Sequence, residues 1–357
     1  MVSYARAVHS FSMLSVPLLA GLFALAGCGG STSDTSGGSG GSAGTAAGGA
    51  DAGSTGGSGG SSASGGSGGS AGSGVGGAGG ATAHKCFSDI QDGIVYVNYD
   101  QFHPVINSTC SGTNHQDIQG VEKLVFLGDS ITEGTPPTPA SGFYRTLVTN
   151  NVKKKFGSNL EVADCAKWGA RDDDLAGQIQ KCFPTTPEPK KTLTVFTMGG
   201  NDLADMAKNH LDVTAATAQA DQAIADARSA VEWLKDPKNF PNGSYVVFAN
   251  VYEYTDLSAN LDSCPLASTA GLSGTWQTGV SILTRVDEQY MKIAVDTQSD
   301  MIFMEESFCG HGYENTDQSL QCYRGPNTER WFDLTCIHPT PKGHSVIADL
   351  FTKTIEE

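Results

Sequence analysis

Residues 123–134 of this 357-residue chain read KLVFLGDSITEG, an apolar run that ends in Gly128, Asp129 and Ser130. The short apolar run at residues 123–127 is typical of a strand buried inside a parallel sheet. Such a strand carries the residues that follow it to the edge of the sheet. We therefore expect Ser130 to stand at that edge as a candidate nucleophile, with Asp129 fixing the turn by hydrogen bonds to the backbone.

The same pattern predicts the rest of the fold. Four more segments are short, apolar and rich in β-branched residues, and they indicate further buried strands at residues 160–163, 193–198, 245–250 and 301–304. Helical periodicity is clearest at residues 214–234, and two other helices are predicted at 280–295 and 341–355. Strands that alternate with helices imply an α/β fold, here a three-layer α/β/α sandwich around a mainly parallel five-stranded sheet.

Three short motifs fall where such a sheet binds its ligands, beyond the carboxyl ends of the strands. Ser130 follows the first predicted strand, Gly169 lies in the loop after the second, and Asn201 follows the third within GGND, residues 199–202. A serine hydroxyl needs a base to accept its proton as it attacks a carbonyl. The candidate base is His338 in CIHP, residues 336–339, and His344 is the alternative.

Read in order, Ser130, Gly169, Asn201 and His338 resemble the blocks of the SGNH/GDSL hydrolases, over residues 121–357. The resemblance implies the flavodoxin-like SGNH hydrolase fold and a serine esterase that works through an acyl-enzyme, without a metal or another cofactor. It also implies three donors to the oxyanion, namely the backbone NH groups of Ser130 and Gly169 and the side-chain amide of Asn201.

The chain departs from this family at the residue that should orient the histidine. The family has Asp three residues before His, but that position is Thr335, and the nearest acid is Asp333. We expect Asp333 to serve if the segment FDLTC, residues 332–336, turns tightly. The hydroxyl of Thr335 and a backbone carbonyl are the alternatives. The loop DCAKWG, residues 164–169, keeps only the final glycine of the family block.

Other features near these motifs have plainer interpretations. The run of acids at residues 172–174 is more typical of a solvated loop or a helix start than of a calcium site, which needs six or more oxygen ligands. Trp168, beside Gly169, is expected either to line an acyl pocket or simply to pack. Residues 307–330 indicate an irregular disulfide-tied loop, a candidate wall of the pocket.

The first 83 residues indicate export. Residues 1–27 have a polar start with Arg6 and an apolar stretch too short for a membrane span, and small residues precede Cys28. This pattern predicts a signal peptide and lipidation of Cys28. Residues 28–83, almost wholly Gly, Ser, Ala and Thr, read as a flexible tether. Residues 84–120 then form an extension of the hydrolase domain at 121–357, giving a monomer anchored by lipid to the outer membrane or cell surface.

Cysteine usage and charge agree with an exported enzyme. The eight cysteines after Cys28 lack the paired spacing of a zinc site, so disulfides are favoured, and nearness suggests Cys86 with Cys110 and Cys165 with Cys182. A formal net charge of −16 argues against nucleic acid as a partner. The expected substrate is an ester, either an acylated polysaccharide or a lipid. The alternative is a non-catalytic surface-binding lipoprotein on the same scaffold.

Overall fold

A parallel sheet forms the centre of the fold in the computed structural model, which describes residues 81–91 and 96–357. Its strands run in the order β2-β1-β3-β4-β5, and each neighbouring pair is parallel. The strands are β1 (Lys123–Gly128), β2 (Glu161–Asp164), β3 (Thr192–Thr197), β4 (Ser244–Ala249) and β5 (Asp300–Ile302). The predicted signal peptide, Cys28 and almost all of the predicted tether lie outside the described residues.

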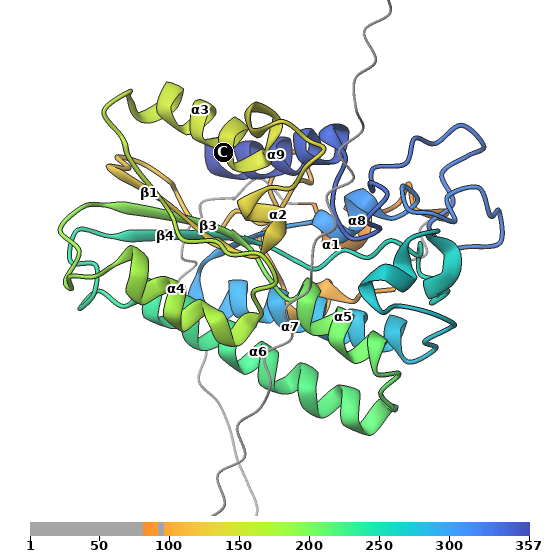
Figure 1. The fold of residues 1–357 in the computed structure, drawn as a ribbon. Coiled ribbons are helices and arrows are strands. Elements are labelled where there is room, and N and C mark those ends of the chain that lie inside the picture. The colour runs from red at the N-terminus through yellow and green to blue at the C-terminus, as the bar shows by residue number, and fades with distance from the viewer. Residues whose placement is uncertain (1–80, 92–95) are drawn as a thin grey trace, which may run out of the picture. The chain divides into compact units, whose positions relative to one another are not determined.

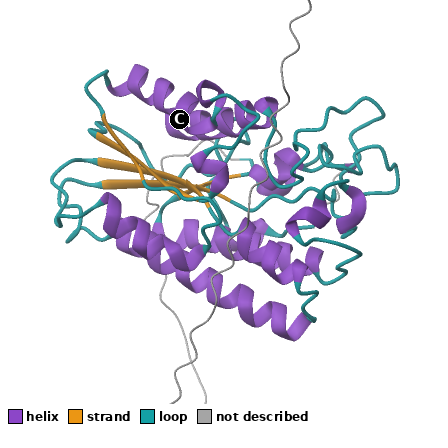
Figure 2. Ribbon diagram, in the orientation of Figure 1, coloured by secondary structure: helices purple, strands orange, loops and turns teal. Residues whose placement is uncertain are grey.

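Helices cover both faces of this sheet (Figures 1 and 2). On one face α3 (Tyr144–Phe156) packs beside α9 (Pro341–Glu356). The other face carries α4 (Leu175–Cys182), α6 (Val213–Lys235) and α7 (Gly279–Thr297). Shorter helices are α1 (Ala83–Cys86), α2 (Ser130–Glu133), α5 (Gly200–Lys208) and α8 (Met304–Phe308). The predicted three-layer α/β/α sandwich is confirmed.

The register of β1 against β3 brings the carboxyl ends of these two strands to the same height in the sheet. Every residue of both strands is buried, as expected for strands covered on two faces. Gly128 pairs with Thr197, so the residues that follow the two strands begin at the same height. Ser130 and Asn201 therefore emerge from adjacent strands onto one edge of the sheet.

Predicted and observed elements agree closely in position, with one informative difference. The strand predicted at 301–304 ends at Ile302, and Met304 begins α8 instead. The side-chain oxygen of Asn250 accepts hydrogen bonds from the backbone NH groups of Met304 and Glu305, at 2.7 and 3.0 Å. This capping satisfies donors at the start of the helix and stops the strand.

The segment that precedes β1 is fastened to the β5 edge of the sheet. The hydroxyl of Thr113 donates to Asp300 at 2.9 Å, and the amide of Gln116 donates both to Asp300 and to the backbone oxygen of Val246. A Cβ at Gly112 would lie 2.6 Å from the backbone oxygen of Met301, so only glycine allows this approach. The predicted extension thus packs directly on the sheet.

Four disulfide bonds join the eight cysteines after Cys28. Both pairings suggested by the sequence, Cys86–Cys110 and Cys165–Cys182, are present. The other two are Cys264–Cys336 and Cys309–Cys322.

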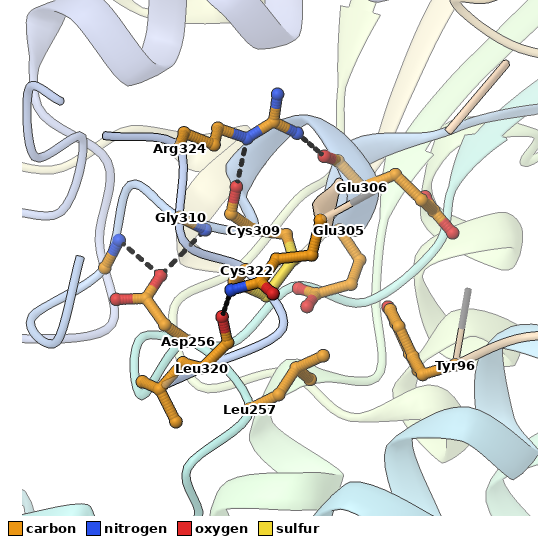
Figure 3. The surroundings of a disulfide bond; sticks show 12 residues. Tyr96, Asp256, Leu257, Glu305, Glu306, Cys309, Gly310, Leu320, Cys322 and Arg324 are labelled. Carbon is orange, nitrogen blue, oxygen red and sulfur yellow. Dashed lines mark hydrogen bonds between the residues drawn. A yellow bond between two sulfur atoms is a disulfide. The ribbon is translucent and has the colours of Figure 1, made fainter. Parts of the chain in front are cut away.

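The Cys309–Cys322 bond lies within the predicted irregular loop at 307–330, and Figure 3 shows how that loop is held. Asp256 accepts hydrogen bonds from the backbone NH groups of Gly310 and Gly312, at 2.9 and 2.8 Å. From the other side, Arg324 donates to the backbone oxygen of Cys309. The loop is therefore a rigid neighbour of the segment that contains Asp256.

Two features are absent from the described part of the chain. Within residues 81–91 and 96–357, no helix combines the length and the apolar character needed to cross a bilayer. In the same ranges, no group of three or more His, Cys, Asp or Glu side chains is arranged to hold a metal ion.

Candidate active site

Ser130 is presented by a tight turn between β1 and α2. Gly128 has φ +126°, and a Cβ there would lie 2.5 Å from the backbone oxygen of Thr197. Asp129 caps α2 by accepting from the backbone NH of Ile131, and it also accepts from the Thr197 hydroxyl, both at 2.9 Å. Burial raises the pKa of Asp129 to about 6. These contacts give Asp129 the turn-fixing position expected from the sequence.

His338 lies against this serine. Its Nε2 is 2.9 Å from the Ser130 Oγ, and both residues are buried. Burial lowers the pKa of His338, and the charge of Asp333 partly offsets that effect. A lowered pKa keeps the imidazole neutral at neutral pH, which is the form that can accept the hydroxyl proton.

The other nitrogen of His338 contacts Thr335 rather than a carboxylate. Its Nδ1 lies 2.7 Å from the Thr335 Oγ1, and that hydroxyl donates to Asp333 Oδ1 at 2.5 Å. The backbone NH of Thr335 donates to the same oxygen at 2.8 Å. The FDLTC segment does turn tightly, as the sequence interpretation required, but Asp333 reaches His338 through the Thr335 hydroxyl.

The turn that carries His338 is anchored on several sides. Cys336, at φ +74°, forms the disulfide with Cys264. The hydroxyl of Tyr252 donates to the backbone oxygen of Ile337 at 2.8 Å. Because these anchors leave the turn little freedom, the short contacts of His338 are built into the fold.

His344, the alternative base, lies elsewhere. It is fully buried in α9, where its Nδ1 accepts a hydrogen bond from the backbone NH of Tyr144 at 3.3 Å. Its ring stacks near Tyr144, and burial lowers its pKa to about 4. These contacts assign His344 to packing between α3 and α9.

The candidate oxyanion donors sit on three neighbouring segments. Gly169 has φ +73° and open space where a Cβ would be, so substrate can approach its backbone NH. The preceding Trp168 donates from its backbone NH to Glu133 in α2, which holds this loop beside Ser130. Asn201 donates one amide hydrogen to the backbone oxygen of Ala170 at 2.8 Å, leaving its second hydrogen for an oxyanion.

Two acids next to these donors form a buried support that the sequence interpretation missed. Asp172 is 1% exposed, and Tyr290 donates to both of its carboxyl oxygens at 2.9 Å. Its backbone NH donates to Asp202 at 3.1 Å. Burial and the nearby Asp202 raise the pKa of Asp172 well above its usual range. The 3-10 helix Asp172–Asp174 does start here, but the solvated interpretation is wrong for Asp172.

An apolar cavity of about 120 Å³ lies beside the candidate nucleophile, and Ser130 and Asn201 both line it. Trp168 does not belong to its lining, and neither does any residue of the loop 307–330. The Trp168 ring is half exposed and lies 5.9 Å from the ring of His338. The loop instead supports Asp256, whose neighbours Thr255 and Leu257 are part of the wall.

Comparison with known protein families agrees with this geometry. The sequence profile of the GDSL-like Lipase/Acylhydrolase family matches residues 126–346, which is more than half of the chain. The chain belongs to this family. The matched range contains all four positions that carried the resemblance, Ser130, Gly169, Asn201 and His338. This GDSL-like protein is therefore a carboxylic ester hydrolase.

Solved structures similar to this GDSL-like hydrolase are distant in sequence. A gut microbial diltiazem-metabolizing enzyme shares 16% identity at TM-score 0.47, over 68% of this chain and 48% of its own, so this chain spans about half of its length. The acetylxylan esterase Axe2 from Geobacillus stearothermophilus shares 18% identity at TM-score 0.40, over 67% of this chain and 96% of its own. Phospholipase A1 from Streptomyces albidoflavus shares 17% identity at TM-score 0.44, over 65% of this chain and 98% of its own. No curated protein matches the sequence.

Proposed function

We propose that this GDSL-like hydrolase cleaves carboxylic esters through an acyl-enzyme on Ser130, with His338 as general base and acid. The observation that carries the proposal is the 2.9 Å contact between the Ser130 Oγ and the His338 Nε2. The Oγ attacks the ester carbonyl carbon while its proton passes to Nε2. His338 then gives that proton to the departing alcohol oxygen, and the acyl group stays on Ser130.

Deacylation repeats these steps with water. His338 takes a proton from water as the water oxygen attacks the acyl carbon, and it returns the proton to Ser130 as the carboxylic acid leaves. In each half-reaction the carbonyl oxygen becomes an oxyanion that needs fixed donors. We assign this role to the backbone NH groups of Ser130 and Gly169 and to the second amide hydrogen of Asn201.

We place Asp333 behind the histidine as an indirect partner. The Thr335 hydroxyl donates to Asp333 and accepts from Nδ1–H of His338, so one proton arrangement satisfies every contact. In that arrangement Nε2 carries no hydrogen and faces the serine. The function of the usual Asp is thereby shared between Thr335 and Asp333.

We also propose that the enzyme works outside the cytoplasm, held by lipid on Cys28. The support is the signal-like stretch at residues 1–27, the small residues before Cys28 and the Gly- and Ser-rich segment that follows. Its substrate would then be an ester of an extracellular polymer or lipid, met at the cell surface.

One labelling experiment tests both proposals. The full-length chain is expressed in a bacterium that processes lipoproteins and is treated with a fluorophosphonate probe, which reacts with activated serines. We expect strong labelling of the wild type in the membrane fraction and no labelling of Ser130→Ala. The Cys28→Ser variant should be labelled but should leave the membrane. Equal labelling of wild type and Ser130→Ala would contradict the catalytic assignment, and membrane-bound Cys28→Ser would contradict the anchor.

A further inference from the structure

We infer that the acyl part of the substrate is an apolar chain longer than acetyl, held in the cavity that runs from Ser130 along α5. This inference rests on the proposed acyl-enzyme, because it assumes that the acyl group is attached to Ser130. The decisive observation is the lining of the cavity, which includes Ser130 and Asn201 and continues to Ala207 and Trp276.

The direction of the cavity follows from α5. Asn201 stands in the first turn of this helix, whereas Ala207 stands near its end, and both line the cavity. Trp276 also lines it, and its ring nitrogen donates to the backbone oxygen of Leu211, just beyond the helix, at 2.9 Å. The cavity therefore extends along α5 from the nucleophile to Trp276, and seven residues of helix correspond to about 10 Å.

Small residues on α5 create this space. Gly200, Ala204 and Ala207 are spaced i, i+4 and i+7, which places them on one face of the helix, and all three line the cavity. Leucine at these positions would fill it. Across from them stand larger apolar side chains of α7 and of the segment after β4, among them Leu283 and Leu261.

The acidic groups of the lining are already engaged. Glu253 accepts hydrogen bonds from the backbone NH groups of Thr255 and Leu257, and burial raises its pKa. Asp129 is held by Ile131 and Thr197. Since these carboxyl groups are bound to their own chain, the interior offers an incoming acyl group mainly apolar surface. An acetyl group would leave most of that surface without a partner.

The experiment uses the full-length chain and a series of p-nitrophenyl esters from acetate to dodecanoate. We expect kcat/KM to rise roughly fourfold per added methylene until the chain reaches Trp276, and then to fall. Ala207→Leu should fill the far end, so the ratio of kcat/KM for decanoate to that for butyrate should drop at least tenfold. Ala225→Leu makes the same change at an exposed position of α6 and should leave the whole profile unchanged.

The outcomes separate this inference from the proposed function. If Ser130-dependent activity is greatest for acetate and declines with each methylene, the long-chain inference is overturned and the serine hydrolase stands. If Ala207→Leu folds and keeps the wild-type ratio, the placement along α5 is overturned. Should Ala207→Leu fail to fold, Ala204→Val narrows the cavity nearer to Asn201, and the ratio of kcat/KM for decanoate to that for butyrate is measured for that variant instead. Hydrolysis that persists unchanged in Ser130→Ala would overturn the proposed function and this inference with it.

Discussion

The Thr335 hydroxyl has one hydrogen to donate and two neighbours that could receive it. Asp333 is the stronger acceptor because it is a carboxylate, and it already accepts from the backbone NH of Thr335. The hydroxyl oxygen is then left to accept from His338 Nδ1–H. In the proposed mechanism, a single uncharged side chain thus sets the tautomer of His338.

Replacing this hydroxyl should therefore cost catalysis more than stability. In Thr335→Val, the Nδ1–H of His338 loses its acceptor, and we expect kcat to fall on the order of a hundredfold or more, as when the orienting acid of a serine triad is replaced. Thr335→Ser keeps a hydroxyl and should recover most of the rate. Steady-state kinetics on one ester decides the matter. A Val variant as active as the Ser variant would remove Thr335 from the mechanism.

Asp333 gives a prediction with a definite sign. His338 works as a base only when neutral, so the acid limb of the kcat/KM profile follows the pKa of His338. Burial lowers that pKa, and the charge of Asp333 partly raises it again. Asp333→Asn should thus reduce the rate and move the acid limb to lower pH, away from the ordinary histidine range. A shift of the limb to higher pH in a pH-rate profile would contradict the charge coupling.

The candidate residues differ in how far the sequence could predict them. Ser130, Asn201 and His338 stand in short motifs after strands or before a helix, so their convergence follows from parallel topology. The arrangement of Thr335 and Asp333 does not follow in that way, because it depends on a turn whose hydrogen bonds span only a few residues. Departure from the family pattern at residue 335 was nevertheless the signal that a different contact had to exist.

At the level of elements, the loop that carries Gly169 and the start of α5, which carries Asn201, are joined to each other. Asn201 donates to the backbone oxygen of Ala170, and the backbone NH of Asp172 donates to Asp202. Tyr290 of α7 then holds Asp172 through its hydroxyl. Tyr290, 118 residues further along the chain than Asp172, therefore fixes the loop beside the candidate oxyanion donors.

Tyr290→Phe tests this support. The change leaves the buried Asp172 without its hydroxyl partner, so we expect the free energy of unfolding to fall by about 1–3 kcal/mol. We also expect a lower kcat with little change in KM, because the donors act mainly on the transition state. Tyr245→Phe is the matched control, since its hydroxyl donates to Gln119 at an exposed position. If Tyr290→Phe matches the control in both urea unfolding and ester kinetics, Tyr290 does not support the loop as we infer.

Sequence patterns predicted the five strands as short apolar runs, and they predicted the three longest helices because helical periodicity there extends over many residues. All five strands and the helices α6, α7 and α9 lie within two residues of their expected bounds. The short helix α5 was not predicted, since GGND resembles a turn and the helix that follows has only nine residues. The face of α5 that carries Gly200, Ala204 and Ala207 lines the cavity only because the fold packs α5 against α7, and the sequence alone does not predict this packing.

Across the residues that the structure describes, ten Asp and Glu side chains are buried. Burial raises the pKa of Asp256 and of Glu306 to about 7, and that of Asp202 to about 6. Asp172, Asp287 and Glu305 are raised well above their usual range, also chiefly by burial. Three histidines shift the other way: burial lowers the pKa of His311 and His344 to about 4, and it also lowers the pKa of His338.

These opposite shifts determine how stability depends on pH. A buried acid with a raised pKa binds a proton in the folded state that the unfolded chain has already lost, so its contribution falls as pH rises above the unfolded value. A histidine with a lowered pKa opposes this only where the unfolded histidine is still protonated, below about pH 6.5. Between about pH 6 and 8, the acids outnumber the histidines and determine the slope.

We therefore expect the free energy of unfolding to decrease from about pH 6 to about pH 8, by about 1.4 kcal/mol per pH unit for each excess proton held by the folded state. Urea unfolding at several pH values measures this slope. Glu306→Gln should make it shallower, because glutamine keeps an oxygen to accept from the Asn250 amide but cannot release a proton. Glu232→Gln, at an exposed position of α6, should leave the slope as it is. Stability that rises with pH across this range would show that the buried carboxyl groups are charged in the folded state and compensated by partners, which is the opposite of what their surroundings imply.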